Sequence, residues 1–187
     1  MARFVSEVAA YDVTGMHVRL IYRLDRYLRA GDQLSFLQAG YPAVRFTEPN
    51  ENFAHQHQDV RVENGQQFGD LPQFVDFAYT ARVARVNGAA LANLAWAPTA
   101  PKEARIDTTQ LTNDTTLTWK ANPEPDLAGY EVVWRESTDP LWTHSIPVGN
   151  VTSYTIPDLS KDNVQVGVRA VDRNGYRSPV AFPVPSG

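Results

Sequence analysis

The 187-residue sequence contains no cysteine, which excludes disulfide bridges, thiolate metal sites and cysteine nucleophiles. It has no run of about 18 apolar residues, so we expect no membrane-spanning helix, and its first residues lack the apolar stretch of a signal peptide. Its formal net charge of -4 lacks the basic excess of a nucleic-acid-binding protein, so we expect no nucleic-acid partner. Hydrophobic residues make up 43% and charged residues 20%, which is ordinary for one globular domain or two small ones.

The composition of the sequence changes at residues 97–104, a stretch with two prolines and several small side chains. Such a stretch favours a short, semi-extended linker with little to bury. Helical and strand-like patterns alternate before it, and only strand-like patterns and turns follow it. We therefore predict one domain over residues 1–97, a linker over 98–104 and a second domain over 105–187.

The first half shows the order strand, helix, strand, loop and helix that is typical of an α/β layer. Asp32 is the expected N-cap of the first helix after the first strand, and Gly40 is its expected end. The expected elements are a helix at 2–10, a strand at 17–22, a helix at 32–40, a strand at 43–46, a polar loop at 47–69 and an amphipathic helix at 70–94.

The second half contains short alternating runs at regular spacing, separated by turn signals, which predicts a small antiparallel β-sandwich. Asn174-Gly175 supplies a tight turn before the last strand. The expected strands are 116–119, 129–135, 143–148, 153–156, 164–171 and 180–184.

These runs resemble a fibronectin type III domain. The resemblance rests on Leu117-Thr118-Trp119, on the alternation of residues 130–134, and on the stretch 168–175 with its Val-x-Ala-Val-Asp-x-x-Gly pattern. Leu159 stands where the family keeps a corner leucine, whereas Val164 replaces the usual corner tyrosine. The resemblance implies a sandwich that could contact a protein or a carbohydrate. Of the tryptophans in this half, we expect Trp119 and Trp134 in the core and Trp142 exposed.

The loop at residues 46–59 gathers most of the candidate functional side chains of the first half. They are His55, His57, Glu48, Glu51 and Asp59. Imidazole is a common zinc ligand, and a nearby carboxylate can orient it. On spacing alone, a metal or proton-transfer site and a solvated polar loop explain the pattern equally well. For the pair Glu48 and Glu51 the spacing favours a solvated turn over a calcium loop.

Residues 31–46, Gly-Asp-Gln-Leu-Ser-Phe-Leu-Gln-Ala-Gly-Tyr-Pro-Ala-Val-Arg-Phe, resemble a block near the end of the co-catalytic zinc aminopeptidases, the family of the bacterial leucyl aminopeptidases. The shared features are an Asp-containing turn, a helix that ends in glycine, and a Pro-Ala strand followed by a ligand loop. The resemblance extends over residues 4–97. It implies an α/β fragment, part of a mixed-sheet aminopeptidase-like domain, joined to an all-β fibronectin type III sandwich.

The same resemblance implies one zinc ligand in the loop. The family's His-x-x-x-Asp spacing selects His55, whereas a variant pattern selects His57, which we slightly favour. Asp59 would orient the ligand imidazole without touching the metal.

Substrate contacts are implied near the turn at residues 31–33. The candidates are Tyr27, Arg29 and Asp32, although Gln33 stands where the family has a histidine. For Tyr27 and Arg29 we favour the simpler interpretation, that they are ordinary surface side chains.

A two-zinc hydrolytic site needs several metal ligands and a carboxylate base. The loop is expected to supply only one of these ligands. The sequence contains no Glu-Glu pair, and the only histidine before the loop is His17, in a strand-like run. We therefore predict the C-terminal portion of a zinc aminopeptidase that has no catalytic residue of its own, holds zinc weakly and is inactive alone. In the intact relative the substrate is a peptide. The rival hypothesis is a non-catalytic binding or adhesion protein. Secretion or a periplasmic location is implied only by the resemblance.

Overall fold

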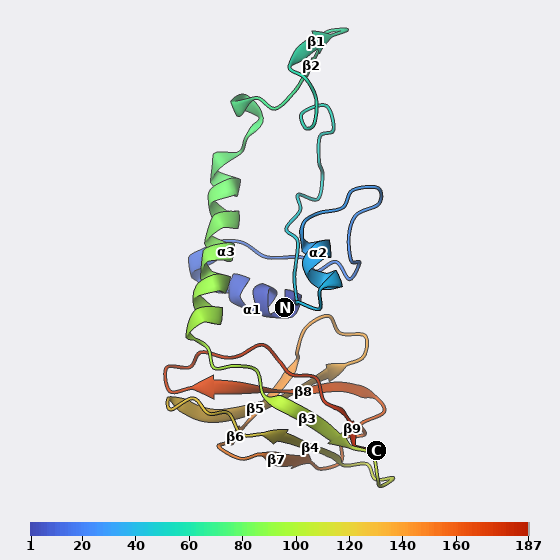
Figure 1. Ribbon diagram of the computed structural model, residues 1–187, viewed down its shortest axis with the longest axis vertical. Helices are drawn as coiled ribbons and strands as arrows, with labels where there is room; N and C mark the ends of the chain where they lie inside the picture. Colours follow the sequence, from blue (N-terminus) through green and yellow to red (C-terminus); the bar gives the residue numbers. More distant parts are fainter. Residues whose placement is uncertain (187) are drawn as a thin grey trace.

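The computed structural model describes residues 1–186 and places a β-sandwich below a more open N-terminal half (Figure 1). Helix α1, Ala2–Ala9, confirms the helix predicted at residues 2–10. It packs against the long helix α3, Phe77–Trp96, through a buried cluster whose members come from both helices. These residues are Val5, Ala9, Val86 and Ala90.

Helix α3 begins later than the predicted start at residue 70. Pro72 opens a short 3-10 turn, η2, Pro72–Phe74, so the chain turns before it enters the helix. The Asp76 side chain then accepts a hydrogen bond from the Tyr79 backbone N–H at 2.9 Å, which caps the first turn. The helix ends at Trp96, immediately before the proline-containing stretch.

Helix α2, Gln33–Gln38, confirms the short helix predicted after Asp32. Asp32 occupies the predicted N-cap position, but its backbone is already helical (φ -60, ψ -27) and its side chain makes no capping hydrogen bond. A second short 3-10 turn, η1, Asp12–Thr14, follows α1.

The two strands predicted in the first half, at 17–22 and 43–46, are wrong. Neither segment forms a strand, and neither belongs to a sheet. Their alternation has another cause: Met16, Val18 and Val44 pack on the cluster between α1 and α3. Within residues 1–97 the described chain forms no α/β layer, and its only paired strands are β1, Arg61–Glu63, and β2, Gln66–Phe68.

Strands β1 and β2 form a hairpin inside the predicted polar loop and project away from the rest of the molecule (Figure 1). Asn64 and Gly65 connect them with positive φ angles of 51° and 81°. Two consecutive positive φ angles match the twist of a two-residue hairpin, which Asn-Gly adopts readily.

The second half forms the predicted sandwich, and its strand pairs are antiparallel except for β3 and β9, which pair in parallel. One sheet has the order β7-β4-β3-β9 and the other the order β6-β5-β8. The strands are β3, Lys102–Asp107; β4, Thr115–Lys120; β5, Leu127–Glu136; β6, His144–Gly149; β7, Ser153–Ile156; β8, Val164–Asp172; and β9, Val184–Ser186.

Two boundaries differ from the prediction. β3 begins at Lys102, inside the stretch expected to be a linker. The last strand lies at 184–186 instead of 180–184, because the preceding segment pairs with β8 through isolated bridges at Arg177 and Ala181 and not through a continuous ladder. The Asn174-Gly175 turn forms with a φ of 87° at Gly175.

The sandwich core is continuous between the two sheets. Trp119 and Tyr130 meet edge to face with ring centroids 5.3 Å apart, as expected for a buried aromatic pair. The Tyr130 hydroxyl accepts a hydrogen bond from the Asn122 N–H at 2.7 Å. Val164, which replaces the corner tyrosine, is itself buried in this core. Trp134 lies at the border of the core and stacks on His144.

A polar joint connects α1 to the outer face of the β6-β5-β8 sheet. Side chains alternate along a strand, so Glu131 of β5 and Arg169 of β8 point away from the sandwich core. Arg169 binds Glu131 at 2.8 Å and Glu7 of α1 at 2.9 Å. Arg177 binds the other oxygen of Glu131 at 3.0 Å. We call Glu7, Glu131, Arg169 and Arg177 the α1–sandwich joint.

Trp142 lies beside this joint and is half-buried, so the prediction of an exposed tryptophan is wrong. Its ring centroid is 5.4 Å from that of Phe182 and 6.0 Å from the guanidinium carbon of Arg3. Arg3 Nε also donates to the Pro140 carbonyl at 2.8 Å. The N-terminal helix therefore covers this aromatic side chain.

Candidate functional site

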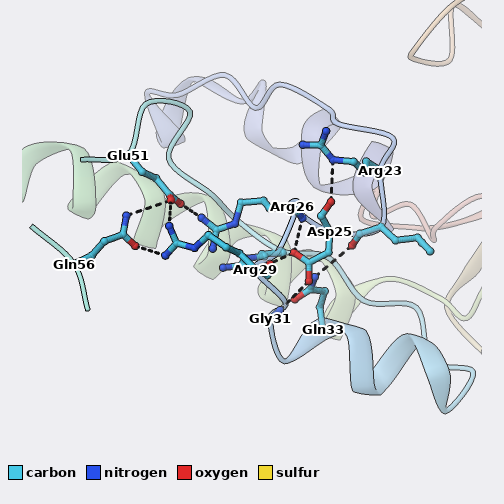
Figure 2. A network of polar contacts seen from close by, with 10 residues as sticks. Arg23, Asp25, Arg26, Arg29, Gly31, Gln33, Glu51 and Gln56 are labelled. Atoms are coloured by element: carbon cyan, nitrogen blue, oxygen red, sulfur yellow. Dashed lines mark hydrogen bonds and ion pairs between the residues drawn. The ribbon is translucent and has the colours of Figure 1, made fainter. Parts of the chain in front are cut away.

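Two arginines and one glutamate connect two loops of the N-terminal half (Figure 2). Arg26 and Arg29 both bind Glu51, and the Arg29 Nη1–Glu51 Oε2 distance is 2.9 Å. Arg29 Nη2 donates to Gln56 Oε1 at 2.5 Å, and Gln56 Nε2 donates to Glu51 Oε2 at 3.2 Å. We call these four residues the Glu51 cluster.

The side chains of the Glu51 cluster are largely withdrawn from solvent. Glu51 retains 15% of its side-chain exposure, Arg26 20% and Arg29 23%. An ion pair at this depth is less screened than one on the open surface. The expectation that Glu51 belongs to a solvated turn is therefore wrong, because two guanidinium groups bind it.

Asp25 organises the loop that carries the two arginines. Its Oδ1 accepts from the Arg26 N–H at 2.7 Å and from Arg45 Nη1 at 3.0 Å, and its Oδ2 accepts from the Gly31 N–H at 2.8 Å. The hydrogen bond from the Arg26 backbone is the main cause that holds the pKa of Asp25 below its ordinary value. Asp25 thus remains a carboxylate and closes the loop at residues 25–31 (Figure 2).

Gln33, the residue after Asp32, is buried and faces this loop. Its Nε2 donates to the Leu24 carbonyl at 3.3 Å, and its side chain also hydrogen-bonds Asp25. Gly31 leaves the room that this arrangement needs, because a Cβ there would lie 2.3 Å from Gln33 Oε1. Gln33 is therefore part of the support of the loop.

The predicted ligand candidates lie on the loop that follows Glu51. The His55 ring stacks on Phe74 with a centroid distance of 3.6 Å and an interplanar angle of 7°. His57 is exposed and has a positive φ of 53°. Asp59 is exposed as well, and its backbone carbonyl accepts from Arg61 at 3.3 Å.

Imidazole and carboxylate are donors that zinc accepts, but a stable zinc site needs about four of them around one point. Among residues 1–186, no three histidine, aspartate or glutamate side chains gather in a way that could hold a metal ion. The residues of this chain therefore do not fit a complete zinc site by themselves. The ligand roles of His55 and His57 and the orienting role of Asp59 stay predictions.

The predicted substrate contacts lie in different surroundings. Tyr27 is 80% exposed, with the Arg23 guanidinium carbon 4.6 Å from its ring centroid. Asp32 lines a shallow, open hollow together with Gly31, Gln33 and Arg45. Arg29 is engaged by Glu51 and Gln56, which leaves Tyr27 and Asp32 as the more accessible pair.

Sequence reasoning missed Asp25, Arg26, Gln56 and the binding role of Glu51. The two arginines are separated from their partners Glu51 and Gln56 by more than 20 residues, so no periodic pattern connects them. The available signal for these ion pairs was the recurrence of arginine at 26 and 29, followed later in the sequence by a loop with two glutamates.

No family model matches this chain. A probable zinc metalloprotease of Pyrenophora tritici-repentis is 57% identical over 99% of this chain and 38% of its own length. A probable zinc metalloprotease of Leptosphaeria maculans is 57% identical over 99% of this chain and 43% of its own length. One from Pyricularia oryzae is 54% identical over 99% of this chain and 38% of its own length. The chain is thus homologous to proteins named probable zinc metalloproteases and spans about two fifths of their length.

Structural neighbours of the chain are fibronectin type III domains. The FN1–FN3 domains of chicken CNTN1 match with a TM-score of 0.39 and 19% identity over 46% of this chain and 30% of that one. An Fn3-like protein from Clostridium thermocellum matches with a TM-score of 0.37 and 24% identity over 49% of this chain and 96% of that one. These scores support no statement about a ligand or a role. Among residues 1–186, no helix combines the length and the apolar character needed to cross a membrane.

Proposed function

We propose that this chain is the C-terminal portion of a zinc-dependent peptidase of the co-catalytic aminopeptidase type, and that it is inactive on its own. The observation that supports this most directly is the 57% identity, over 99% of the chain, to a relative named a probable zinc metalloprotease. The aminopeptidase reaction, removal of an N-terminal residue from a peptide, rests on the resemblance of residues 31–46.

In this proposal the chain contributes one imidazole ligand, from His57 or His55, with Asp59 orienting it. The exposure of His57 supports its access to a metal, whereas the stacking of His55 on Phe74 supports a fixed ring direction. The remaining ligands and the carboxylate base belong to the part of the relatives that this chain does not span. When bound, zinc would polarise the peptide carbonyl and activate water. Tyr27 and Asp32 form part of the substrate wall.

A hybrid protein tests this contribution. The present 187 residues replace the matching stretch of the Pyrenophora tritici-repentis relative, and zinc content and aminoacyl-anilide hydrolysis are measured against the parent. We expect the hybrid to keep both zinc and hydrolysis. Of His57→Ala and His55→Ala, the variant that removes the ligand should lose zinc and about a hundredfold of kcat, the upper end of the cost of disturbing a metal site. His144→Ala, on the exposed side of the sandwich, is the matched control. Retention of full zinc content by both loop variants would refute a ligand role for this loop.

The isolated chain tests the second part of the proposal. The purified 187-residue protein should contain zinc well below one ion per chain and should not hydrolyse aminoacyl-anilides, because no three suitable donors gather in its described residues. Two tightly held zinc ions, or turnover that a chelator abolishes, would overturn the proposed dependence on further residues.

A further inference from the structure

We propose that Arg29, Glu51 and Gln56 form a clamp that sets the direction of the loop carrying His55 and His57. Arg29 is then a positioning residue that acts through Gln56 and not a substrate contact. That this loop serves a metal site rests on the proposed function, whereas the effect of the clamp on the loop does not.

Gln56 lies between the two histidines, and both polar atoms of its side chain are held. Arg29 Nη2 binds Oε1 at 2.5 Å, and Glu51 Oε2 accepts from Nε2 at 3.2 Å (Figure 2). An amide held at both ends cannot rotate without breaking a hydrogen bond. Residues 55–58 form a bend, so fixing the Gln56 side chain also fixes the backbone from which the neighbouring His55 side chain projects. The His55 ring lies against Phe74.

The other side of the clamp is itself fixed. Asp25 closes the loop at residues 25–31 by accepting from the Arg26 and Gly31 N–H groups. Arg45 Nη1 binds Asp25 and also donates to the Arg29 carbonyl at 3.2 Å. The Arg29 side chain therefore projects from a supported backbone, and its position is transmitted to Gln56.

The geometry requires a guanidinium group. Arg29 reaches Glu51 with Nη1 and Gln56 with Nη2, so two acceptors on the neighbouring loop are bound at once. A lysine ammonium is a single charged point on a flexible stem and lacks this fork. Arg29→Lys should consequently keep the attraction to Glu51 but release Gln56.

The test uses NMR of the 187-residue protein at one fixed pH. Protons above an aromatic face are shielded, so the His55 ring protons should resonate upfield, and Phe74→Leu defines their unshielded position. We expect Gln56→Ala and Arg29→Lys to move these resonances most of the way to that position. Amide resonances of the sandwich report that each variant is folded. Gln58→Ala and Arg19→Lys are matched controls, since Gln58 and Arg19 are both exposed and lie outside the clamp.

Unchanged His55 resonances in both folded clamp variants would overturn the proposal, as would equal shifts in the two controls. The hybrid protein described above separates this outcome from failure of the proposed function. There, Gln56→Ala should lower kcat with KM nearly retained, whereas Gln58→Ala should not. If the hybrid shows no zinc-dependent hydrolysis at all while the NMR shifts occur as expected, the proposed function fails and the clamp stands.

Discussion

In the sandwich, Leu117, Val132 and Val168 are at most 1% exposed, whereas Leu28 and Leu24 of the N-terminal half are 106% and 74% exposed. The sandwich has a continuous apolar core between its two sheets, and the N-terminal half has one small cluster between α1 and α3. Around that cluster, extended loops are held by carboxylate–arginine contacts. The difference shows that the two halves depend on different interactions: one on burial, the other on ion pairs and on contact with its neighbour.

The largest expected effect comes from separating the halves. A fragment of residues 98–187, which retains the whole of β3, should unfold in one cooperative transition, because its core and the pairs of Glu131 with Arg169 and Arg177 stay intact. A fragment of residues 1–97 should show no sharp transition, because it buries little apolar surface. Calorimetry measures both. A sharp heat-absorption peak for residues 1–97 would remove the contrast between the halves.

The second effect concerns the α1–sandwich joint. Glu131→Ala leaves Arg169 buried without its main partner, and we expect it to lower the free energy of unfolding by about 3–5 kcal/mol. Glu7→Gln removes the charge of the more exposed ion pair, Glu7 with Arg169, and should lower the free energy of unfolding by about 1 kcal/mol or less. Urea unfolding at pH 7 measures both changes. A loss below 1 kcal/mol for Glu131→Ala would mean that the joint contributes little.

The third effect compares the same Leu→Ala truncation at a buried and at an exposed position. Leu117→Ala, in the sandwich core, should cost about 2–5 kcal/mol through lost contacts and a cavity. Leu111→Ala changes the same atoms on a residue that is 105% exposed, and it should stay within about 0.5 kcal/mol of the wild type. Leu28→Ala should match Leu111→Ala, which extends the comparison to the N-terminal half. An equal loss at Leu117 and Leu111 would contradict the burial assignment.

The smallest effect is a pH dependence at the connection between the halves. Burial raises the pKa of Glu124, but hydrogen bonds from the Thr99 hydroxyl and N–H and from Asn122 outweigh it and lower the pKa to about 2. Because the pKa of Glu124 is lower in the folded state, its carboxylate stabilises the fold at pH values above the ordinary pKa of 4.5. This stabilisation is lost as the pH falls from 4.5 towards 2. Because solvent screens this group, we expect at most about 1 kcal/mol.

Denaturant unfolding between pH 7 and pH 2 measures this contribution. Glu124→Gln should reduce the acid-induced loss of stability, and Glu103→Gln, at an exposed pair with Lys120, should not. Identical pH profiles for Glu124→Gln and the wild type would exclude the contribution of Glu124.

The sequence was sufficient to predict the strands and turns that are specified by local patterns. The alternation of residues 130–134 and the Asn174-Gly175 turn predicted β5 and the turn after β8. β3 was missed because Lys102–Asp107 is rich in charge and follows a proline. The alternation at 17–22 predicted a strand that does not form, because a pattern within one segment cannot tell whether a neighbouring strand exists.

The sequence predicted which loop carries the candidate site, but not the contacts that hold this loop. The loop with His55 and His57 stood out by composition, whereas the two arginines at 26 and 29 were only a weak signal of what holds it. Contacts such as Arg29 with Glu51 and His55 with Phe74 join loops far apart in the chain. Their formation depends on backbone paths that side-chain periodicity does not encode. Asp25, at the centre of one set of such contacts, had no distinguishing neighbour in the sequence.

The projecting β1–β2 hairpin offers a place to attach a reporter. Exposed loop tips tolerate alteration better than packed positions, and Glu63 on β1 is exposed. Since the sequence has no native thiol, Glu63→Cys would create a unique point for a fluorophore, remote in the chain from the α1–sandwich joint. The fluorophore's emission would change when another protein binds over the β1–β2 hairpin, which gives a direct optical signal for binding at this hairpin.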